Sequence, residues 1–512
     1  MTKKNIAKSA AMIAGFTLLS KALGFIREVV IAAKFGSGMA TDAYFVAMSA
    51  TTIIMGTLGA ALNTTLIPIF SEIGEKRGRT GRLKYLNNIL NIIFFITIIL
   101  AILGFILSPL IIKILAKGFT GEQFDLAVRL NRIGLPIIIF LGFTYVFSGF
   151  LHSYEIFGPH AIMGIPYNLV FLIYLFFFGD KTDITMLMVT SVIASAMQFL
   201  IQVPAVNHLG YRYKIDVNLN DRYLRKAMKL VIPVLIGSAV QQLNVIVDKT
   251  MASDLVEGSI SSLTYASRIN DMIITVFVMA ITTVVFPMLS KAFSQEDNDM
   301  VIKIFNQGIN IILIITVPAT IGIIVLAEPM VHLFFERGAF DYSATVMTSQ
   351  GLIFYSFGLI GSSLRLMLNK VFYSFQDTKT PMTNGALAVG FNIVFNLLLV
   401  KSLGHRGLAL ATSISVTIST MMLFGHLRRK IGRIGIKNML TSFIKTFVAA
   451  LIMGIVVYIL YYKLGALLPG VKIVQMITLL ISVGIGVIIY FFLCLIFRVG
   501  EMKLLVRKAL RR

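Results

Sequence analysis

Residues 17–42 read TLLSKALGFIREVVIAAKFGSGMATD, an apolar stretch with charged side chains where a membrane helix ordinarily has none. At about 100° per residue, its polar and small residues up to position 28 fall within one arc of roughly 120°. The opposite arc is entirely hydrocarbon. Because charges are costly inside a bilayer, the polar arc must face protein or a water-filled cavity. The arc consists of Thr17, Ser20, Lys21, Gly24, Arg27 and Glu28.

Two interpretations of this arc remain open from the sequence. In the first, its cations line a transport cavity, since ionisable groups at membrane depth usually mark transport paths. In the second, Lys21 and Glu28, two turns apart on one face, form an ion pair that holds helices together. Gly24 and Gly15 have a similar structural alternative, the close approach of another helix. We favour the cavity interpretation.

The composition excludes an ordinary soluble enzyme. Of 512 residues, 57% are hydrophobic and only 13% are charged, which is typical of a multi-pass membrane protein. The net charge of +23 therefore has to be judged by where the cations lie relative to the spans. The single cysteine, Cys494, excludes an intrachain disulfide and argues against a thiolate metal site.

Apolar runs long enough to cross a bilayer, about 20 residues each, recur along the whole chain. They predict an all-α polytopic membrane protein with about fourteen transmembrane helices. The runs lie near residues 12–34, 42–70, 86–112, 130–150, 159–178, 185–205, 227–252, 261–289, 304–326, 346–374, 382–400, 407–426, 440–462 and 474–497.

Basic residues concentrate in alternate loops, among them residues 76–84, 212–226 and 428–437. The positive-inside bias makes these loops cytoplasmic, and an even number of spans then places both termini inside. The same loops are expected to contact anionic membrane lipids. Nucleic-acid binding is not expected, because the cations are dispersed and lack interleaved aromatic residues.

The polar connection at residues 207–225 divides the chain after the sixth predicted span. The second half again opens with a charged span, which carries Asp248 and Lys249. Corresponding charged spans suggest an internal repeat, the usual construction of alternating-access transporters. We therefore predict a six-helix lobe at residues 1–221, a second at 222–430, and a final helix pair with a basic tail at 431–512.

No motif for bond chemistry is present. The sequence lacks a GxxxxGK[ST] phosphate loop, and its six histidines form no metal-ligand pattern, so we expect a transporter without a cofactor rather than an enzyme. Buried cations do recur, at Arg268 and Arg365 in later spans. Arginine suits phosphate oxygens through its planar, bidentate donors. The alternatives are a local pair of Arg268 with Asp271 and snorkelling of Arg365 to an interface.

Six segments carry a family resemblance: SKALGFIREVVIAAKFGSGMATDAYFVA (20–47), NTTLIPIFSE (63–72), YASRIND (265–271), VFPMLSKAF (285–293), VFYSFQDTKTP (371–381) and GHRGLALATSIS (404–415). Together they resemble the MurJ (MviN) family, the lipid II flippases of bacterial cell-wall synthesis. The superfamily also includes multidrug and polysaccharide exporters. The resemblance extends over essentially the whole chain, and the first and fifth segments are the most specific.

The resemblance implies two six-helix lobes around a cationic central cavity, with the final helix pair forming a groove for the lipid tail. The family often has arginine in place of Lys21, and many members carry an arginine pair in the second span, where residues 49–57 of this chain have no charge. Positions that match the family's polar cavity residues are Ser20, Lys21, Arg27, Asp42 and Arg268. Positions where some relatives bind sodium are Asp248, Asn392, Asn396 and Thr412, with Asn396 replacing an acidic ligand.

These observations predict a monomeric flippase of the bacterial cytoplasmic membrane, which moves lipid II from the inner to the outer leaflet by alternating access. Sodium or the membrane potential is the expected driving force. The alternatives are a flippase for another polyprenyl-pyrophosphate-linked precursor, a multidrug exporter of the same superfamily, and a membrane scaffold whose charges only pair helices. Predicted substrate contacts are Ser20, Lys21, Arg27, Asp42, Arg268 and Arg365, and predicted gating or ion-pair residues are Glu28 and Asp271.

Overall fold

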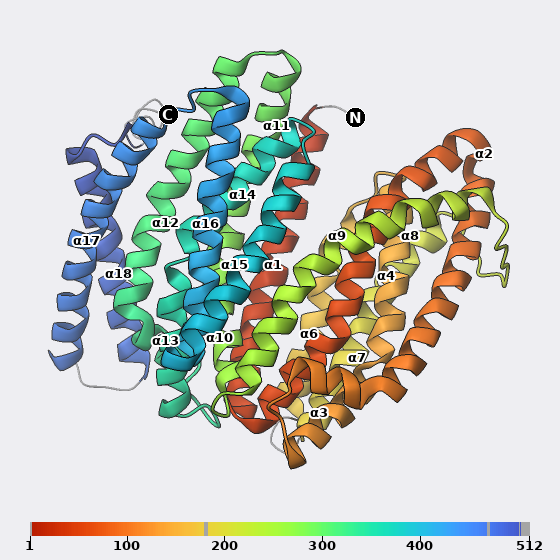
Figure 1. The fold of residues 1–512 in the computed structure, drawn as a ribbon, viewed down its shortest axis with the longest axis horizontal. Coiled ribbons are helices and arrows are strands. Elements are labelled where there is room, and N and C mark those ends of the chain that lie inside the picture. The colour runs from red at the N-terminus through yellow and green to blue at the C-terminus, as the bar shows by residue number, and fades with distance from the viewer. Residues whose placement is uncertain (1–2, 179–182, 468–471, 501, 503–512) are drawn as a thin grey trace. The chain divides into compact units, whose positions relative to one another are not determined.

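The computed structural model describes residues 3–178, 183–467, 472–500 and 502, and these residues are almost all helical (Figure 1). No strand occurs among them. Ten helical segments of the described chain are long and apolar enough to cross a membrane, or eleven if the bent pair α13 and α14 forms one span. The prediction of an all-α polytopic membrane protein is confirmed.

The described residues form two compact units. The first extends to Ser261 and includes Arg337–Phe340, and the second comprises the remainder from Ser262 onward. Helices of the first unit are α1 (Lys3–Phe35), α2 (Met39–Leu115), α3 (Gly121–Gly134), α4 (Pro136–His152), α5 (Gly158–Ile162), α6 (Gly164–Phe177), α7 (Ile184–Leu200), α8 (Val203–His208) and α9 (Arg222–Ser253).

The remaining helices begin with α10, which starts in the first unit and continues into the second. They are α10 (Ser259–Ile273), a π-helical turn (Ile274–Val278), α11 (Met279–Ser294), α12 (Asn298–Phe334), α13 (Tyr342–Ser356), α14 (Leu359–Ser374), α15 (Lys379–Leu403), α16 (His405–Ile431), α17 (Ile436–Leu467) and α18 (Lys472–Ile496). Because α9 packs on α2, it belongs to the first compact unit. The repeat boundary at residue 222 stays a prediction.

The longest element, α2, consists of two arms that meet at Gly78 (Figure 1). Gly78 has φ +62° and ψ −161°, a conformation that only glycine adopts without strain. The chain therefore turns here without a separate loop. Both arms contribute apolar side chains to one core against α4: Leu66 and Phe70 from the first arm, Leu86 from the second, and Phe150 from α4.

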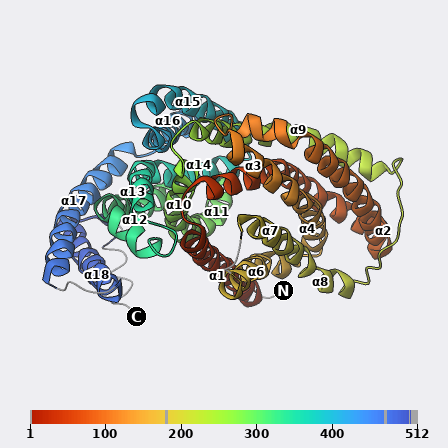
Figure 2. The same cartoon turned by 90° about the horizontal axis from the view of Figure 1, so that it is seen from below.

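The second unit is built around α12, which packs against α14, α17 and α18. Tyr490 of α18 donates a 3.0 Å hydrogen bond to the carbonyl of Ile314 in α12. Two helix pairs, α15 with α16 and α17 with α18, run side by side in both views (Figure 1, Figure 2). Their outward side chains, such as Leu398 and Leu480, are exposed and apolar, as expected of surfaces that face lipid.

The connection between α14 and α15 is held to the end of α16 by Asp377. Its carboxylate accepts a 2.7 Å bond from Lys430 Nζ, and bonds of 3.0 and 2.9 Å from the amide and hydroxyl of Thr380. Burial alone would raise the pKa of Asp377, but the bonds and charge of these two partners lower it to about 2. The ionised form is thus stabilised in the folded protein.

We expect Asp377→Asn to lower the melting temperature by up to about 2 °C near neutral pH, because the pair is largely solvated. Since the folded-state pKa lies below the unfolded one, the stabilisation is complete above about pH 4 and disappears as the pH falls to about 2. Thermal unfolding of both proteins across this pH range measures the effect. A difference that stayed constant with pH would contradict the assignment.

Candidate functional site

The polar arc of α1 packs against α6 within the first unit. Asn168 of α6 donates a 3.0 Å hydrogen bond to the carbonyl of Ser20 and a 2.8 Å bond to the carbonyl of Gly164. A Cβ atom at Gly164 would collide with Ser20 Oγ, so glycine allows this close approach. Gly24 lies beside the Asn168 side chain, whereas Gly15 has nothing near it in the described structure. A Cβ atom at Gly24 would make only ordinary contact with Asn168, at 3.7 Å, so the close approach of described residues requires glycine at position 164 but at neither 15 nor 24.

Arg27 is the centre of this contact. Its Nη1 donates to Asn168 Oδ1 at 3.0 Å, and its Nη2 donates to Glu28 Oε1 at 2.6 Å. The guanidinium carbon lies 5.3 Å from the ring centre of Tyr167 and 5.1 Å from that of Phe171. The Arg27 side chain is 16% exposed and that of Glu28 only 4%. The cation is thus held in place by an ion pair, an amide and two rings.

The structure corrects one alternative drawn from the sequence. Glu28 pairs with Arg27, its neighbour in the chain, and Lys21 is exposed and forms no ion pair with any described residue. The ion-pair partner of Glu28 is therefore Arg27 and not Lys21, and the predicted gating role of Glu28 stays a prediction. An arginine beside a buried carboxylate is an anion site only if the anion competes with that carboxylate. Two of the guanidinium's five donors are engaged in bonds between described side chains.

Asp42 lies at the start of α2 and caps the start of α10. Its Oδ2 accepts a 2.8 Å bond from the amide of Gly258. Its Oδ1 accepts bonds of 2.7 and 2.6 Å from the amide and hydroxyl of Ser261. A buried carboxylate at a helix N-terminus is favourable, because it satisfies free amides and opposes the helix dipole. Asp42 therefore has a structural role that the sequence did not suggest, and its predicted contact with substrate stays a prediction.

The remaining predicted substrate contacts belong to the second unit, so they are described separately from Arg27. Arg268 and its neighbour on α10, Asp271, are exposed. Arg365 on α14 is half-buried and makes no hydrogen bond or ion pair with any other described residue. A half-buried arginine without a protein partner retains its five donors for a ligand or an interface.

Three of the four residues predicted as a sodium site lie together in the second unit. Asn396 donates a 2.9 Å bond to Asn392, and Asn392 donates a 3.2 Å bond to Thr412. Asp248 belongs to α9 in the first unit, where Asn244 donates a 3.3 Å bond to it. The described residues contain no group of three histidine, cysteine or acidic side chains that would hold a metal.

Sequence reasoning missed the residues of α6 that hold Arg27. Asn168 lies in GIPYNLVFLIY, where it is the only amide in an apolar run. A lone amide at membrane depth needs internal partners, and this signal was available. The aromatic neighbours Tyr167 and Phe171 gave no signal, because aromatic residues are common in the spans of this chain, which has 39 phenylalanines and 17 tyrosines.

An apolar groove of about 640 Å³ lies within the second unit, between α12, α14, α16 and α17. Arg428 is the only charged residue that lines it. Apart from Thr417 and Thr420, the other side chains of the wall are apolar, such as Leu313, Leu364, Met421, Phe424, Met439 and Phe443. Such a groove suits a hydrocarbon chain whose charged end lies near the arginine.

The helical multi-pass fold of this chain is that of known membrane transporters, and the solved structures that share it include the following two. One, titled lipid II flippase MurJ in an inward closed conformation, is 25% identical with a TM-score of 0.80, covering 95% of this chain and 98% of that one. The other, an inward-facing MATE family multidrug transporter of the MOP superfamily, is 16% identical with a TM-score of 0.66, covering 81% and 95%. The second likeness concerns the fold alone.

The sequence comparisons identify the family. A family model described as lipid II flippase MurJ matches residues 31–491, so the chain belongs to the MurJ family. A probable lipid II flippase MurJ of Rickettsia prowazekii is 28% identical over 94% of this chain and 96% of its own length. The lipid II flippase MurJ of Burkholderia cenocepacia is 27% identical over 83% of this chain and 84% of its own. The resemblance noted in the sequence is confirmed.

Proposed function

We propose that this chain is a flippase that carries lipid II from the inner to the outer leaflet of the bacterial cytoplasmic membrane by alternating access. Membership of the MurJ family over residues 31–491 supports this function. The observation that carries it at the level of residues is Arg27, an arginine within an apolar span whose guanidinium is positioned by Asn168 and Glu28. Lipid II presents a pyrophosphate, the type of anion that arginine binds best.

Glu28 acts as a competitor for this arginine. In the substrate-free protein the ion pair neutralises Arg27 and keeps both charges satisfied in a buried place. An entering pyrophosphate displaces the carboxylate and takes over the guanidinium, so binding is coupled to a change in the α1–α6 contact. From the family resemblance, we propose that Ser20, Lys21 and Asp42 of the first unit also contact lipid II, and that Arg268 and Arg365 of the second unit do so as well. We propose that the Asp271 carboxylate competes with the substrate anion for Arg268, in the same way that Glu28 competes for Arg27.

The apolar groove of the second unit is the proposed place of the polyprenyl tail. Its wall offers hydrocarbon and aromatic surface, and Arg428 is its only charged lining residue. Transfer of apolar surface from water into protein is favourable by about 25 cal/mol of free energy per Å². The polyprenyl tail enters the groove from lipid rather than from water, so it gains little of this free energy. The groove therefore guides the tail during translocation more than it adds affinity.

The proposed span count is fourteen. A count by length and hydropathy omits the charged helices α1 and α9 and counts the two arms of α2 as one span. Dividing α2 at Gly78, counting α13 with α14 as one span, and adding α1 and α9 gives fourteen. The basic loops then lie in the cytoplasm together with both termini, and face anionic lipids there. The two predicted lobes and the final helix pair fit this count.

We propose that sodium or the membrane potential drives the cycle. The chain of Asn392, Asn396 and Thr412 offers neutral oxygens, the ligand type that a hard monovalent cation prefers. Asp248, the fourth residue of the predicted sodium site, belongs to the first unit, and its part in the cycle stays a prediction. The protein is proposed to act as a monomer without a further cofactor.

Depletion of the protein from cells that lack another lipid II flippase tests the proposal. We expect lipid II at the outer leaflet to fall while lipid II in the inner leaflet accumulates. Re-expression of the wild type restores the outer pool and serves as the control. Unchanged exposure at the outer leaflet would overturn the proposed function, and loss of a different lipid-linked precursor would indicate another polyprenyl-pyrophosphate substrate.

A further inference from the structure

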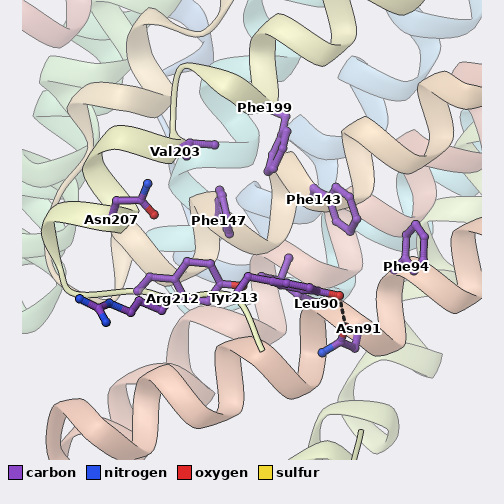
Figure 3. A pocket seen from close by; sticks show the side chains of 11 residues that line it. Leu90, Asn91, Phe94, Phe143, Phe147, Phe199, Val203, Asn207, Arg212 and Tyr213 are labelled. Atoms are coloured by element: carbon purple, nitrogen blue, oxygen red, sulfur yellow. Dashed lines mark hydrogen bonds between the residues drawn. The ribbon is translucent and has the colours of Figure 1, made fainter. Parts of the chain in front are cut away.

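A second cavity, of about 690 Å³, lies within the first unit, away from Arg27 (Figure 3). It is bounded by the second arm of α2, by α4, by α7 with α8, and by the segment that follows α8. We call it the aromatic slot, after the side chains that form most of its wall: Phe94, Phe143, Phe147, Phe199, Tyr211 and Tyr213.

The rings of the slot form one continuous surface. Phe143 stacks on Phe94 with ring centres 6.0 Å apart and contacts Phe199 at 5.3 Å. Phe147 contacts Phe199 at 5.1 Å and Tyr211 at 5.9 Å. The wall between Phe94 and Tyr211 is therefore apolar without interruption. A surface of this kind binds hydrocarbon and excludes water.

One end of the slot is polar. In Figure 3, Arg212 and Asn207 lie at the end opposite Phe94. Both side chains are exposed, and neither forms a hydrogen bond or ion pair with another described side chain. The Tyr211 hydroxyl is buried and has no hydrogen-bond partner among the described residues. The slot thus ends in a cation and an amide that have no partner among the described side chains.

The polar end is held rigidly by three asparagines of α2. Asn87 bonds to the backbone of Arg212 at 3.2 Å and of Lys214 at 2.9 Å. Asn91 donates to the carbonyl of Lys214 at 3.0 Å and accepts a 2.6 Å bond from the Tyr213 hydroxyl. Asn88 exchanges two bonds, of 3.0 and 2.7 Å, with the backbone of Asn218. These bonds fix the backbone of the segment against α2, so Arg212 is held at this end of the slot while its side chain stays exposed.

The other end of the slot adjoins surface that faces lipid. Phe95, next to Phe94, is 51% exposed, and Ile99, one turn further, is 56% exposed. Both lie in an apolar arm of α2 that is long enough to span the membrane. A hydrocarbon chain can therefore enter the slot sideways from the bilayer without crossing water.

We propose that the aromatic slot binds an acyl chain of an anionic glycerophospholipid, with the lipid phosphate at Arg212. The positive charge of Arg212 matches an anionic headgroup, and the volume suits one small hydrocarbon ligand. The polyprenyl tail of a lipid-linked precursor has several times more carbon atoms than an acyl chain and is too large for it. The proposal concerns a site separate from Arg27 and does not depend on the proposed transport function.

The absence of tryptophan from the chain allows a direct test. In full-length Phe199→Trp protein reconstituted into vesicles, the introduced indole reports only on the slot. We expect phosphatidylglycerol with brominated acyl chains to bind in the slot and quench the indole. At equal mole fraction, its affinity for the slot should be about fivefold higher than that of brominated phosphatidylcholine. This factor is the expected contribution of about one cation near an anionic headgroup. Arg212→Gln should remove this preference.

Ile99→Trp is the matched control, because this position faces lipid on the same helix and should be quenched equally by both lipids. Phe143→Trp provides a second reporter if Phe199→Trp does not fold. Glycerol phosphate, which has a headgroup but no chain, should not reduce the quenching. Three results would each overturn the proposal. The first is equal quenching by both lipids at the slot, and the second is a preference for phosphatidylglycerol that remains in Arg212→Gln. The third is that undecaprenyl phosphate, added as a competitor, displaces the brominated lipid more strongly than unlabelled phosphatidylglycerol does.

Discussion

Replacing Arg27 by alanine is expected to lower transport by about tenfold to a hundredfold, the value of one or two charge-assisted bonds. It should also destabilise the protein by about 3–5 kcal/mol, because the nearly buried Glu28 then loses the cation that neutralises it. Complementation of a depleted strain measures the first effect, and thermal unfolding of the purified variant measures the second. Arg27→Lys should keep most of the stability but impair transport, since lysine lacks the planar fork.

A double variant separates the two effects of Arg27. Arg27→Ala with Glu28→Ala removes both charges, so most of the lost stability should return. Transport should remain as low as in Arg27→Ala, because the anion still lacks its guanidinium. If the double variant regained transport together with stability, Arg27 would serve only to neutralise Glu28, and the membrane scaffold or another transport site would become the better account.

Asp42→Ala is expected to lower stability by about 3 kcal/mol or more. Three donors at the start of α10, the amide of Gly258 and the amide and hydroxyl of Ser261, lose their acceptor. Because these groups are buried, water cannot replace the carboxylate fully. The amount of protein in the membrane and its melting temperature should both fall.

A graded series checks the role of Asp42 as a cap. Ser261→Ala removes one of the three bonds and should cost about 1 kcal/mol, and Asp42→Asn, which keeps one acceptor oxygen, should lie between it and Asp42→Ala. Transport per folded molecule should fall less than abundance in all three. An Asp42→Asn protein that accumulated normally but did not transport would instead show that Asp42 contacts the substrate, as the sequence predicted.

The spans were predictable because a helix needs about 20 consecutive apolar residues to cross a bilayer. Such a run can be recognised from neighbouring residues in the sequence alone. Within α2, the expected spans at 42–70 and 86–112 correspond to the two arms that meet at Gly78, and no separate loop joins them. The intervening basic residues remain helical, supported by pairs such as Glu72 with Lys76, one turn apart. A basic loop in the sequence is therefore not always a loop in the structure.

The polar arc of α1 was predictable as a face that avoids lipid, but its partners were not. Asn168 is 141 positions from Arg27, and Ser261 is 219 positions from Asp42. Such contacts depend on which helices pack together, and hydropathy carries no information about that choice. Periodicity also could not show that Glu28 pairs with the adjacent Arg27, because neighbours in a helix point about 100° apart.

In the proposed mechanism, the pyrophosphate of lipid II competes with Glu28 for Arg27. The most direct measurement is the thermal shift that lipid II produces in the purified wild type, Glu28→Gln and Arg27→Gln, since a ligand stabilises the folded state according to its affinity. We predict that lipid II raises the melting temperature of Glu28→Gln more than that of the wild type, and leaves Arg27→Gln nearly unchanged. Equal shifts in all three proteins would contradict the account.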